Sequence, residues 1–262
     1  MKNKYELLLS LKLLEYEIKQ LTIYSKECNE CFDLLKNKLD YLCKFMTNDE
    51  NLKQWNLWEN HRDVRQHCER LRETSVKALC DMEKYQSLCT SNHKLDISEY
   101  FTSLSESVKS ELEDFGIDRK SKVLFIGSGA FPISALTIAN EIRAEVMCLD
   151  IDREALNLGE QVANISGLQS MVKFSNEKLR DVAFLKEATH IIVASLVKNK
   201  TEVLDELKGV IGLKTKILLR YGDGLKSVFN YPLDKKLSAE WVQTLNCQSK
   251  NIYDTIILEK AI

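Results

Sequence analysis

The sequence predicts an α/β protein with an N-terminal α-helical bundle or cap and a C-terminal Rossmann-like parallel sheet. Two observations support this prediction. Neither glycine nor proline occurs before Gly116, and the two prolines of the chain are Pro132 and Pro232. In the second half, short apolar runs alternate with helical patterns. We therefore expect a helical domain at 1–115 and a Rossmann-like domain at 116–262.

In the N-terminal half, leucines recur at the three- and four-residue spacing of a buried helix face. They are Leu7, Leu8, Leu11 and Leu14, then Leu34, Leu35, Leu39 and Leu42. Polar stretches at 47–51 and 90–96 are expected to connect the helices. Cys28 and Cys31 form a C-x-x-C pair within the helical pattern, and no second pair completes a zinc site. We interpret them as buried helix residues and expect no metal to be required.

In the C-terminal half, short apolar runs rich in β-branched residues predict strands. They lie at 123–126, 146–149, 171–174, 190–194, 216–219 and 255–258. Helices are expected at 132–142 and 153–166. This alternation predicts a parallel sheet with helices on both faces, and ligands of such sheets bind beyond the carboxyl ends of the strands.

Composition limits the classes of partner. The formal net charge is −2 with acids and bases well mixed, which argues against binding nucleic acid or an anionic membrane surface. Apolar runs are too short to span a bilayer, and charges interrupt the leucine-rich N-terminus, so we expect neither a membrane span nor a signal peptide. The eight cysteines are scattered, which favours a reducing, cytoplasmic location.

The first predicted strand ends in Gly127-Ser128-Gly129, and Pro132 follows. Such a turn lets a ligand approach the backbone, and proline suits the first turn of a helix. An ordinary strand–helix connection also contains such turns. The third glycine of the dinucleotide fingerprint is absent, which argues against a cofactor with a pyrophosphate.

The second predicted strand ends in Asp150-Ile151-Asp152. A carboxylate at Asp150 can accept hydrogen bonds from both ribose hydroxyls, whereas Asp152 is placed to cap the next helix. Adenosine without a pyrophosphate indicates S-adenosylmethionine as co-substrate. Its sulfonium activates three carbons, so these residues do not decide between transfer of a methyl and of an aminobutyl group.

Several motifs resemble the nicotianamine synthase family, and in particular its bacterial, staphylopine synthase-like branch. They are Gly127-Ser128-Gly129-Ala130-Phe131-Pro132, Asp150-Ile151-Asp152, Thr189-His190-Ile191-Ile192, and Arg220-Tyr221-Gly222-Asp223-Gly224 with Phe229-Asn230-Tyr231-Pro232. The resemblance covers about residues 100–232, and the last segment is its most specific part. It is weaker over the N-terminal helices.

The resemblance implies transfer of the 3-amino-3-carboxypropyl (2-aminobutanoyl) group of S-adenosylmethionine to the α-amino group of histidine, with methylthioadenosine as by-product. The product would be an intermediate of an opine-type metallophore used in metal acquisition. The expected partners are the small-molecule substrates, a downstream opine dehydrogenase and a second copy of the chain as a homodimer. The choice between D- and L-histidine, or another amino acid, stays open. An ordinary methyltransferase and a non-catalytic helical interaction protein are the alternatives.

Catalysis of this transfer requires a group that takes a proton from the acceptor amine. The resemblance points to Glu83, in the loosely matching Cys80-Asp81-Met82-Glu83, and to Tyr100 as catalytic residues. Each has a structural alternative, which is a solvated helix face for Glu83 and core packing for Tyr100. The helical half is expected to close over the strand ends and keep water from the sulfonium.

The remaining candidates divide between donor and acceptor. The donor is expected to contact Gly127, Ser128, Gly129, Pro132, Asp150, Ile151, Asp152 and Ser195. The acceptor is expected to contact Arg220, Tyr221, Asp223, Asn230 and Tyr231. Arg220 follows a strand and can clamp a substrate carboxylate through two hydrogen bonds. Asp223 can receive an amine or imidazole, although Asp and Gly are also common turn residues.

Overall fold

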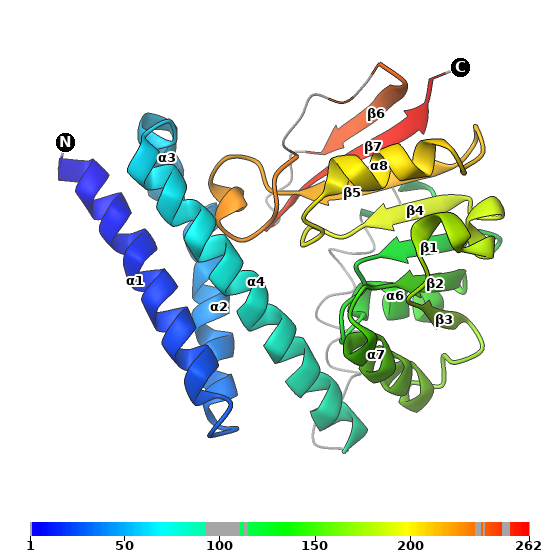
Figure 1. The fold of residues 1–262 in the computed structure, drawn as a ribbon, viewed down its shortest axis with the longest axis horizontal. Coiled ribbons are helices and arrows are strands. Elements are labelled where there is room, and N and C mark those ends of the chain that lie inside the picture. The colour runs from blue at the N-terminus through cyan, green and yellow to red at the C-terminus, as the bar shows by residue number, and fades with distance from the viewer. Residues whose placement is uncertain are drawn as a thin grey trace. The chain divides into compact units, whose positions relative to one another are not determined.

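The computed structural model describes residues 2–92, 111–112, 115–233, 237, 239–247 and 252–261. The chain divides into two compact units. The first comprises Met1–Met82, Tyr221–Leu233 and Cys247–Asp254, and the second comprises Glu83–Arg220, Asp234–Asn246 and Thr255–Ile262. Figure 1 shows the helices of the first unit and the sheet of the second.

The first unit is mainly helical, as the lack of glycine and proline predicts. Its helices are α1 (Lys2–Tyr24), α2 (Cys31–Thr47), α3 (Asp49–Trp58), the start of α4 (Arg62–Ser91) and the short 3-10 helix η4 (Gly224–Val228). The break between α2 and α3 falls in the predicted polar stretch. Asn48 there accepts hydrogen bonds from the backbone N–H groups of Glu50 and Asn51, which caps α3.

The predicted leucine face is buried with one exception. Leu34 is 55% exposed, because Leu35, Leu39 and Leu42 already define the buried face of α2. The interpretation of both cysteines of the C-x-x-C pair as buried helix residues is wrong. Cys28 is exposed in the connection between α1 and α2, and Cys31 is the partly buried first residue of α2, because α1 ends before the polar turn at 25–27. In the described part of the chain, no group of three His, Cys, Asp or Glu side chains is placed to hold a metal ion.

The second unit contains the predicted sheet. Its strands run in the order β3-β2-β1-β4-β5-β7-β6. They are β1 (Lys122–Ile126), β2 (Glu145–Leu149), β3 (Val172–Ser175), β4 (His190–Val193), β5 (Lys216–Tyr221), β6 (Trp241–Cys247) and β7 (Asp254–Lys260). β1 pairs in parallel with β2 and β4, β2 with β3, and β4 with β5. The edge strand β6 was not among the predicted strands, because polar residues interrupt its sequence, Trp-Val-Gln-Thr-Leu-Asn-Cys, and leave no continuous apolar run.

Helices follow β1 and β2 where the sequence predicts them, and further helices that were not predicted follow β3 and β4. After β1 come α6 (Ile133–Thr137) and the π-helical turn η1 (Ile138–Ile142), and α7 (Arg153–Ile165) follows β2. The 3-10 helices η2 (Leu179–Asp181) and η3 (Ala183–Lys186) follow β3, and α8 (Lys200–Lys208) follows β4. All four residues of β4 are buried, as expected for a strand covered on both faces.

The boundaries of the two compact units differ from the predicted division at 115/116. The last turns of α4 belong to the second unit because they hydrogen-bond and ion-pair with the loops beyond β1 and β2. The segment Tyr221–Leu233 belongs to the first unit. Contacts in space, rather than composition, set these boundaries. None of the helices that the structure describes has both the length and the apolar character needed to cross a membrane.

Candidate functional site

The turn after β1 lies at the carboxyl edge of the sheet, as the sequence predicts for a nucleotide-binding turn. Ile126 and Leu149 are partners in the register of β1 and β2, so both strands end at the same level. The backbone N–H groups of Gly127 and Ser128 donate to the carbonyl of Leu149, at 2.8 and 3.2 Å. These bonds hold the glycine turn beside the loop that begins at Asp150.

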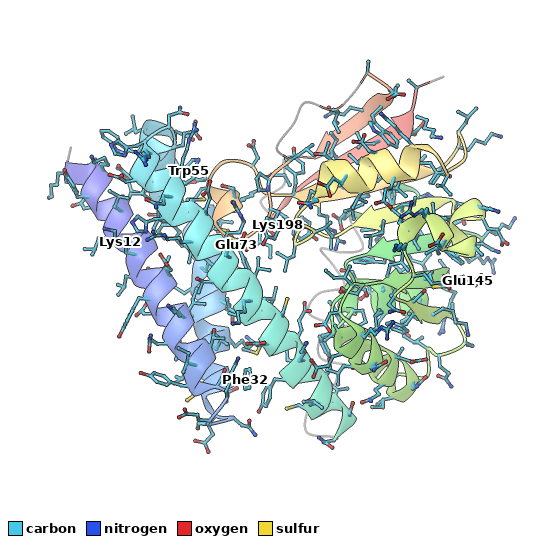
Figure 2. All side chains as sticks on the ribbon, in the orientation of Figure 1. Lys12, Phe32, Trp55, Glu73, Glu145 and Lys198 are labelled. Carbon is cyan, nitrogen blue, oxygen red and sulfur yellow. The ribbon has the colours of Figure 1, made fainter. Side chains whose placement is uncertain are left out.

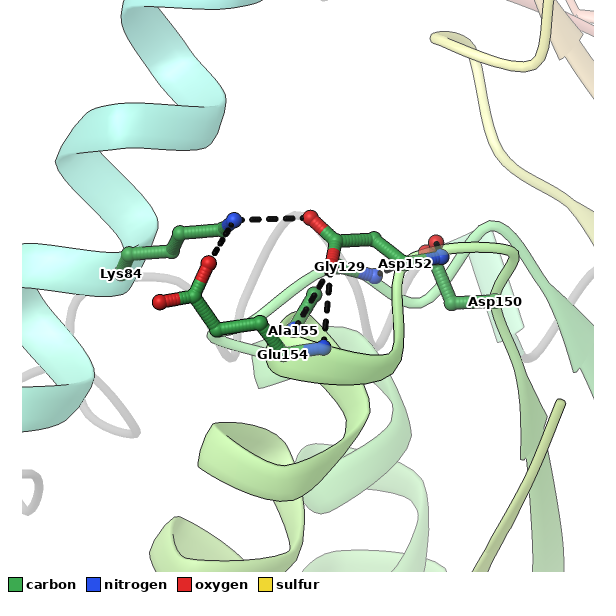
Figure 3. A network of polar contacts seen from close by, with 6 residues as sticks. All are labelled: Lys84, Gly129, Asp150, Asp152, Glu154 and Ala155. Atoms are coloured by element: carbon green, nitrogen blue, oxygen red, sulfur yellow. Dashed lines mark hydrogen bonds and ion pairs between the residues drawn. The ribbon is translucent and has the colours of Figure 1, made fainter.

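Asp150 and the glycine turn are directly bonded. Oδ2 of Asp150 accepts a hydrogen bond from the N–H of Gly129 at 2.8 Å, and Oδ1 accepts one from the N–H of Asp152 at 3.0 Å (Figure 3). Each carboxylate oxygen has a second lone pair with which to accept a ligand hydroxyl. The next side chain, Ile151, is 100% exposed, so an apolar surface adjoins the acid.

Glu83 reaches the same turn from α4. Gly129 has φ +69°, and a Cβ at this position would overlap Oε2 of Glu83. The backbone N–H of Ala130 donates to the Glu83 carboxyl, and Oγ of Ser87, one turn further along α4, donates to the carbonyl of Ala130 at 2.7 Å. Glu83 therefore does not lie on a solvated helix face, which was the structural alternative considered for it. Gly129 is required here both by its backbone conformation and by the space that the carboxyl fills.

The environment of Glu83 favours the protonated form of its carboxyl. Burial raises the pKa of the Glu83 carboxyl, the hydrogen bond from Ala130 lowers it, and the negative charge of Asp150 raises it to a smaller extent, so that the net pKa is about 8. Burial disfavours the charged form of an acid, and a neighbouring like charge acts in the same direction. A carboxyl with such a pKa is suited to exchange protons near pH 7.

Lys84, the neighbour of Glu83, connects α4 to the start of α7. Its Nζ lies 2.8 Å from Oδ2 of Asp152 and 2.5 Å from Oε2 of Glu154 (Figure 3). Asp152 caps α7, because its Oδ1 accepts from the backbone N–H groups of Glu154 and Ala155, at 2.9 and 3.3 Å. The Asp152 carboxyl therefore has internal partners on both oxygens.

A buried lysine holds the loop after β4 through hydrogen bonds to its backbone. This residue was not among the candidates predicted from the sequence. Lys200 is 1% exposed, and its Nζ donates to the carbonyls of Ser195 and Val197 at 2.8 and 2.6 Å. A Cβ at Gly127 would lie 2.6 Å from Cγ2 of Val197, so this loop borders the glycine turn. Ser195 lies in sequence between Ala194 and Val197, the two residues that a Cβ at Gly127 would meet. No local pattern marks Lys200, since lysines at helix starts are usually exposed.

Arg220 has internal partners in place of the expected substrate carboxylate. Its Nε donates to Oε1 of Glu111 at 3.1 Å, Nη2 pairs with Oε2 of Glu111, and Nη1 donates to Oγ of Ser134 at 3.2 Å. Both members of this ion pair are buried. The bidentate clamp foreseen for Arg220 exists, but its partner is a carboxylate of the same chain.

Tyr231, a candidate in the first unit, contacts two charged side chains of α4. Its hydroxyl donates to Oε2 of Glu73 at 3.0 Å, and the guanidinium of Arg72 lies 5.4 Å from its ring centre. Figure 2 shows Glu73 on α4. Arg72 also donates to the carbonyl of Ser227 at 2.7 Å. Burial and the Glu73 carboxylate raise the pKa of Tyr231 to about 12.

The other candidates of this segment stabilise its own conformation. The N–H of Asp223 donates to Oδ2 of Asp254 at 3.0 Å, and the Asp223 carboxylate accepts from the N–H of Gly224. Nδ2 of the buried Asn230 donates to the carbonyl of Ile252 at 2.7 Å. Burial and nearby carboxylates raise the pKa of Tyr221. Tyr100, the remaining candidate, lies outside the described residues.

Comparison with known proteins relates this geometry to a family and to named relatives. A family model described as "Nicotianamine synthase protein" matches residues 7–261. A protein of Pseudomonas aeruginosa (strain UCBPP-PA14) named L-histidine 2-aminobutanoyltransferase is 39% identical over 261 residues, covering 100% of this chain and 99% of the relative. A Yersinia pestis protein of the same name is 36% identical over 266 residues, covering 98% of this chain and 96% of the relative.

Solved structures share the fold at low sequence identity. MtNAS in complex with MTA and tNA is 16% identical with a TM-score of 0.77, covering 94% of this chain and 97% of that one. A glutamate-to-glutamine variant of MtNAS in complex with S-adenosylmethionine is 15% identical with a TM-score of 0.77, covering 95% of this chain and 98% of that one. At this identity the likeness establishes the mixed α/β fold.

Proposed function

Because this chain belongs to the nicotianamine synthase family, we propose that it transfers the 3-amino-3-carboxypropyl group of S-adenosylmethionine to the α-amino group of L-histidine. Methylthioadenosine is the second product. The full-length similarity to relatives named L-histidine 2-aminobutanoyltransferase supports both the reaction and the L-enantiomer. The location is the cytosol, in line with the free thiols of the described cysteines.

The donor site is the edge formed by the glycine turn and the Asp150 loop. Asp150 accepts hydrogen bonds from the ribose hydroxyls, and the exposed Ile151 packs against the adenine. Gly127, Ser128 and Gly129 let the donor approach the backbone, and Ser195 lines the pocket from the loop after β4. Pro132 and Asp152 support the site indirectly, by starting α6 and capping α7.

The observation that carries the proposal is the Glu83 carboxyl, held against the glycine turn with its pKa raised to about 8. Glu83 takes one proton from the ammonium group of histidine. The free amine then forms a bond to the donor carbon γ to its carboxylate, the bond from that carbon to sulfur breaks, and its electron pair stays on sulfur. The new secondary ammonium releases its remaining extra proton to solvent. Tyr100 is the second proposed catalytic residue.

The acceptor is bound by residues of the Arg220–Pro232 region, and Tyr231 is the foremost candidate. Its hydroxyl, together with the carboxylate of Glu73, offers polar partners for the histidine side chain. Tyr221, Asp223 and Asn230 shape the loop that presents it. The reaction needs no metal. A homodimer and a downstream opine dehydrogenase are the proposed protein partners, and neither nucleic acid nor membrane is one.

The direct test is incubation of the protein with S-adenosylmethionine and either L- or D-histidine, followed by mass spectrometry. We expect methylthioadenosine and the aminobutanoyl adduct with L-histidine and little product with D-histidine. Formation of S-adenosylhomocysteine with a methylated product would instead establish a methyltransferase. Absence of donor binding in calorimetry would favour the non-catalytic interaction protein.

Replacing the proposed base separates binding from chemistry. Glu83→Gln is expected still to bind S-adenosylmethionine and to lower kcat at least about 100-fold, which is the usual contribution of a general base. Glu177→Gln is the matched control, because Glu177 is exposed in the loop after β3. Unchanged turnover in Glu83→Gln would remove Glu83 from the mechanism.

A further inference from the structure

We infer that Glu83 and Asp150 form a charge-sensing carboxyl pair, in which binding of cationic S-adenosylmethionine at the glycine turn expels the proton held by Glu83. The catalytic base is then generated by the donor itself. This inference rests on the proposed function, because it assumes that the donor binds at this turn.

The two carboxyls meet at one residue, although they come from different elements. Asp150 follows β2, and its Oδ2 accepts the hydrogen bond of the Gly129 N–H at 2.8 Å. Glu83 is on α4, and its Oε2 occupies the space that a Cβ at 129 would need. Two acids therefore flank the glycine beside which the donor is proposed to bind.

Three cations on the elements around this turn, those of Lys84, Lys200 and Arg220, are engaged with other groups. Lys84 is adjacent to Glu83 in sequence, but its ammonium pairs with Asp152 and Glu154. The ammonium of Lys200 donates to two backbone carbonyls, and the guanidinium of Arg220 pairs with Glu111.

The ionisable groups of β2 do not supply a counter-charge. Burial raises the pKa of the Cys148 thiol, which is therefore neutral at pH 7. Among the described residues, the charge that acts on Glu83 is that of Asp150, and the Ala130 N–H contributes only a dipole.

When no cation is bound near this pair, Glu83 holds a proton. Burial and the charge of Asp150 raise the pKa of Glu83 to about 8, so the carboxyl is mostly neutral at pH 7. The sulfonium of the donor carries a permanent positive charge. An opposite charge within a few ångströms favours the ionised form of an acid and lowers its pKa. Donor binding and proton release are therefore linked.

This linkage gives the reaction an order. Without the donor, Glu83 already carries a proton and cannot accept one from the histidine ammonium. With the donor bound, the carboxylate is free to accept that proton. The amine is thus deprotonated only when the electrophilic carbon is present, which keeps productive proton transfer tied to the occupied donor site.

Isothermal titration calorimetry in buffers of different ionisation enthalpy, phosphate and Tris, counts the protons released. At pH 7 we expect native protein to release about one proton more than Glu83→Gln on binding S-adenosylmethionine. Subtracting the variant removes protons that come from the ligand. The difference falls toward zero at pH 9, where Glu83 has already ionised. S-adenosylhomocysteine, a neutral thioether with the same adenosine and amino acid ends, is expected to release markedly fewer protons.

A second measurement uses native protein alone and does not depend on folding of the variant. As the pH rises toward 8, the Kd of S-adenosylmethionine should decrease up to about tenfold per pH unit relative to that of S-adenosylhomocysteine, and the ratio should level off above pH 8. Both ligands contain an α-amino group, whereas the donor alone contains the sulfonium.

The outcomes separate the inference from the proposed function. Donor binding with equal proton release in native protein and Glu83→Gln would overturn the inference and leave the proposed function standing. Equal release with both ligands would overturn the role of the sulfonium. Failure of native protein to bind S-adenosylmethionine would overturn the proposed function and, with it, the inference.

Discussion

At the scale of the residue, the central feature is a carboxyl in a place that disfavours its charge. Glu83 is held by one backbone N–H and lies near a second acid. Such an arrangement reduces the stability of the folded protein whenever the carboxyl must ionise. Active sites commonly contain groups of this kind, because the same perturbation that destabilises the protein prepares the group for proton transfer.

The stability of the Glu83→Gln variant should therefore exceed that of native protein at alkaline pH. As pH rises from about 4.5 to about 8, the unfolded chain loses the Glu83 proton while the folded protein retains it. The free energy of unfolding contributed by this group falls by up to about 1.4 kcal/mol per pH unit over that window. Chemical denaturation at pH 5 and pH 8.5 measures the effect. A variant whose advantage does not grow with pH would contradict the raised pKa.

Gly129 and Gly167 form a matched pair for testing the glycine turn. Their φ angles are +69° and +70°, but a Cβ at 167 meets nothing within 4 Å, whereas one at 129 meets Glu83. Gly167→Ala should cost about 1 kcal/mol of stability through backbone strain and keep its activity. Gly129→Ala should cost more and lose activity, because the carboxyl is displaced. Equal stability and activity in the two variants would refute the close packing of Glu83.

At the scale of the element, α4 and α7 are joined by a small polar network. Asp152 caps α7 and pairs with Lys84 of α4, and Lys84 also pairs with Glu154 (Figure 3). The Lys84 ammonium lowers the pKa of Asp152. This network fixes the part of α4 that carries Glu83 relative to the Asp150 loop.

Separate substitutions distinguish the cap from the ion pair. Asp152→Asn keeps a good cap and removes the charge, so it should cost no more than about 1 kcal/mol, like Lys84→Met. Asp152→Ala removes both and should cost about 1 kcal/mol more. Urea unfolding at low and high salt measures these differences, and the ion-pair part should shrink at high salt. If Asp152→Asn lowered the free energy of unfolding as much as Asp152→Ala, the cap on α7 would not contribute to the stability of the protein.

At the scale of the whole molecule, contacts between distant parts of the sequence set the architecture. The Arg220–Glu111 pair connects the end of β5 to a residue that precedes the sheet, and the last turns of α4 join the second unit through Glu83, Lys84 and Ser87. Within the first unit, the hydrogen bond between Tyr231 and Glu73 brings together segments that are 158 residues apart in the sequence. These contacts place the candidate residues.

The buried Arg220–Glu111 pair makes opposite predictions for one and two substitutions. Arg220→Met alone leaves a buried carboxylate and should cost about 3–5 kcal/mol, whereas Arg220→Met with Glu111→Met should restore much of that loss. Denaturant unfolding gives the stabilities. If Arg220 serves the fold alone, the double variant also keeps its KM for histidine. A large rise in that KM would instead support the clamp on substrate foreseen from the sequence.

Much of the fold was predictable because local patterns encode it. The missing glycines and prolines indicated helices, and the apolar runs gave β1 to β5 and β7. The edge strand β6 was missed because polar residues interrupt its apolar residues and leave no apolar run. The exposed Cys28 was misassigned because the end of α1 carries no glycine or proline to mark it.

The sequence by itself determined the alternation of elements, the glycine turn and the family resemblance in the Arg220–Pro232 segment. Only the tertiary structure decided what each side chain does. It placed Glu83 against Gly129, gave Arg220 an internal partner and buried Lys200 under the loop of Ser195. The physical reason is that periodicity follows from neighbours along the chain, whereas the pKa and partners of a carboxyl or a guanidinium depend on groups that only folding brings together.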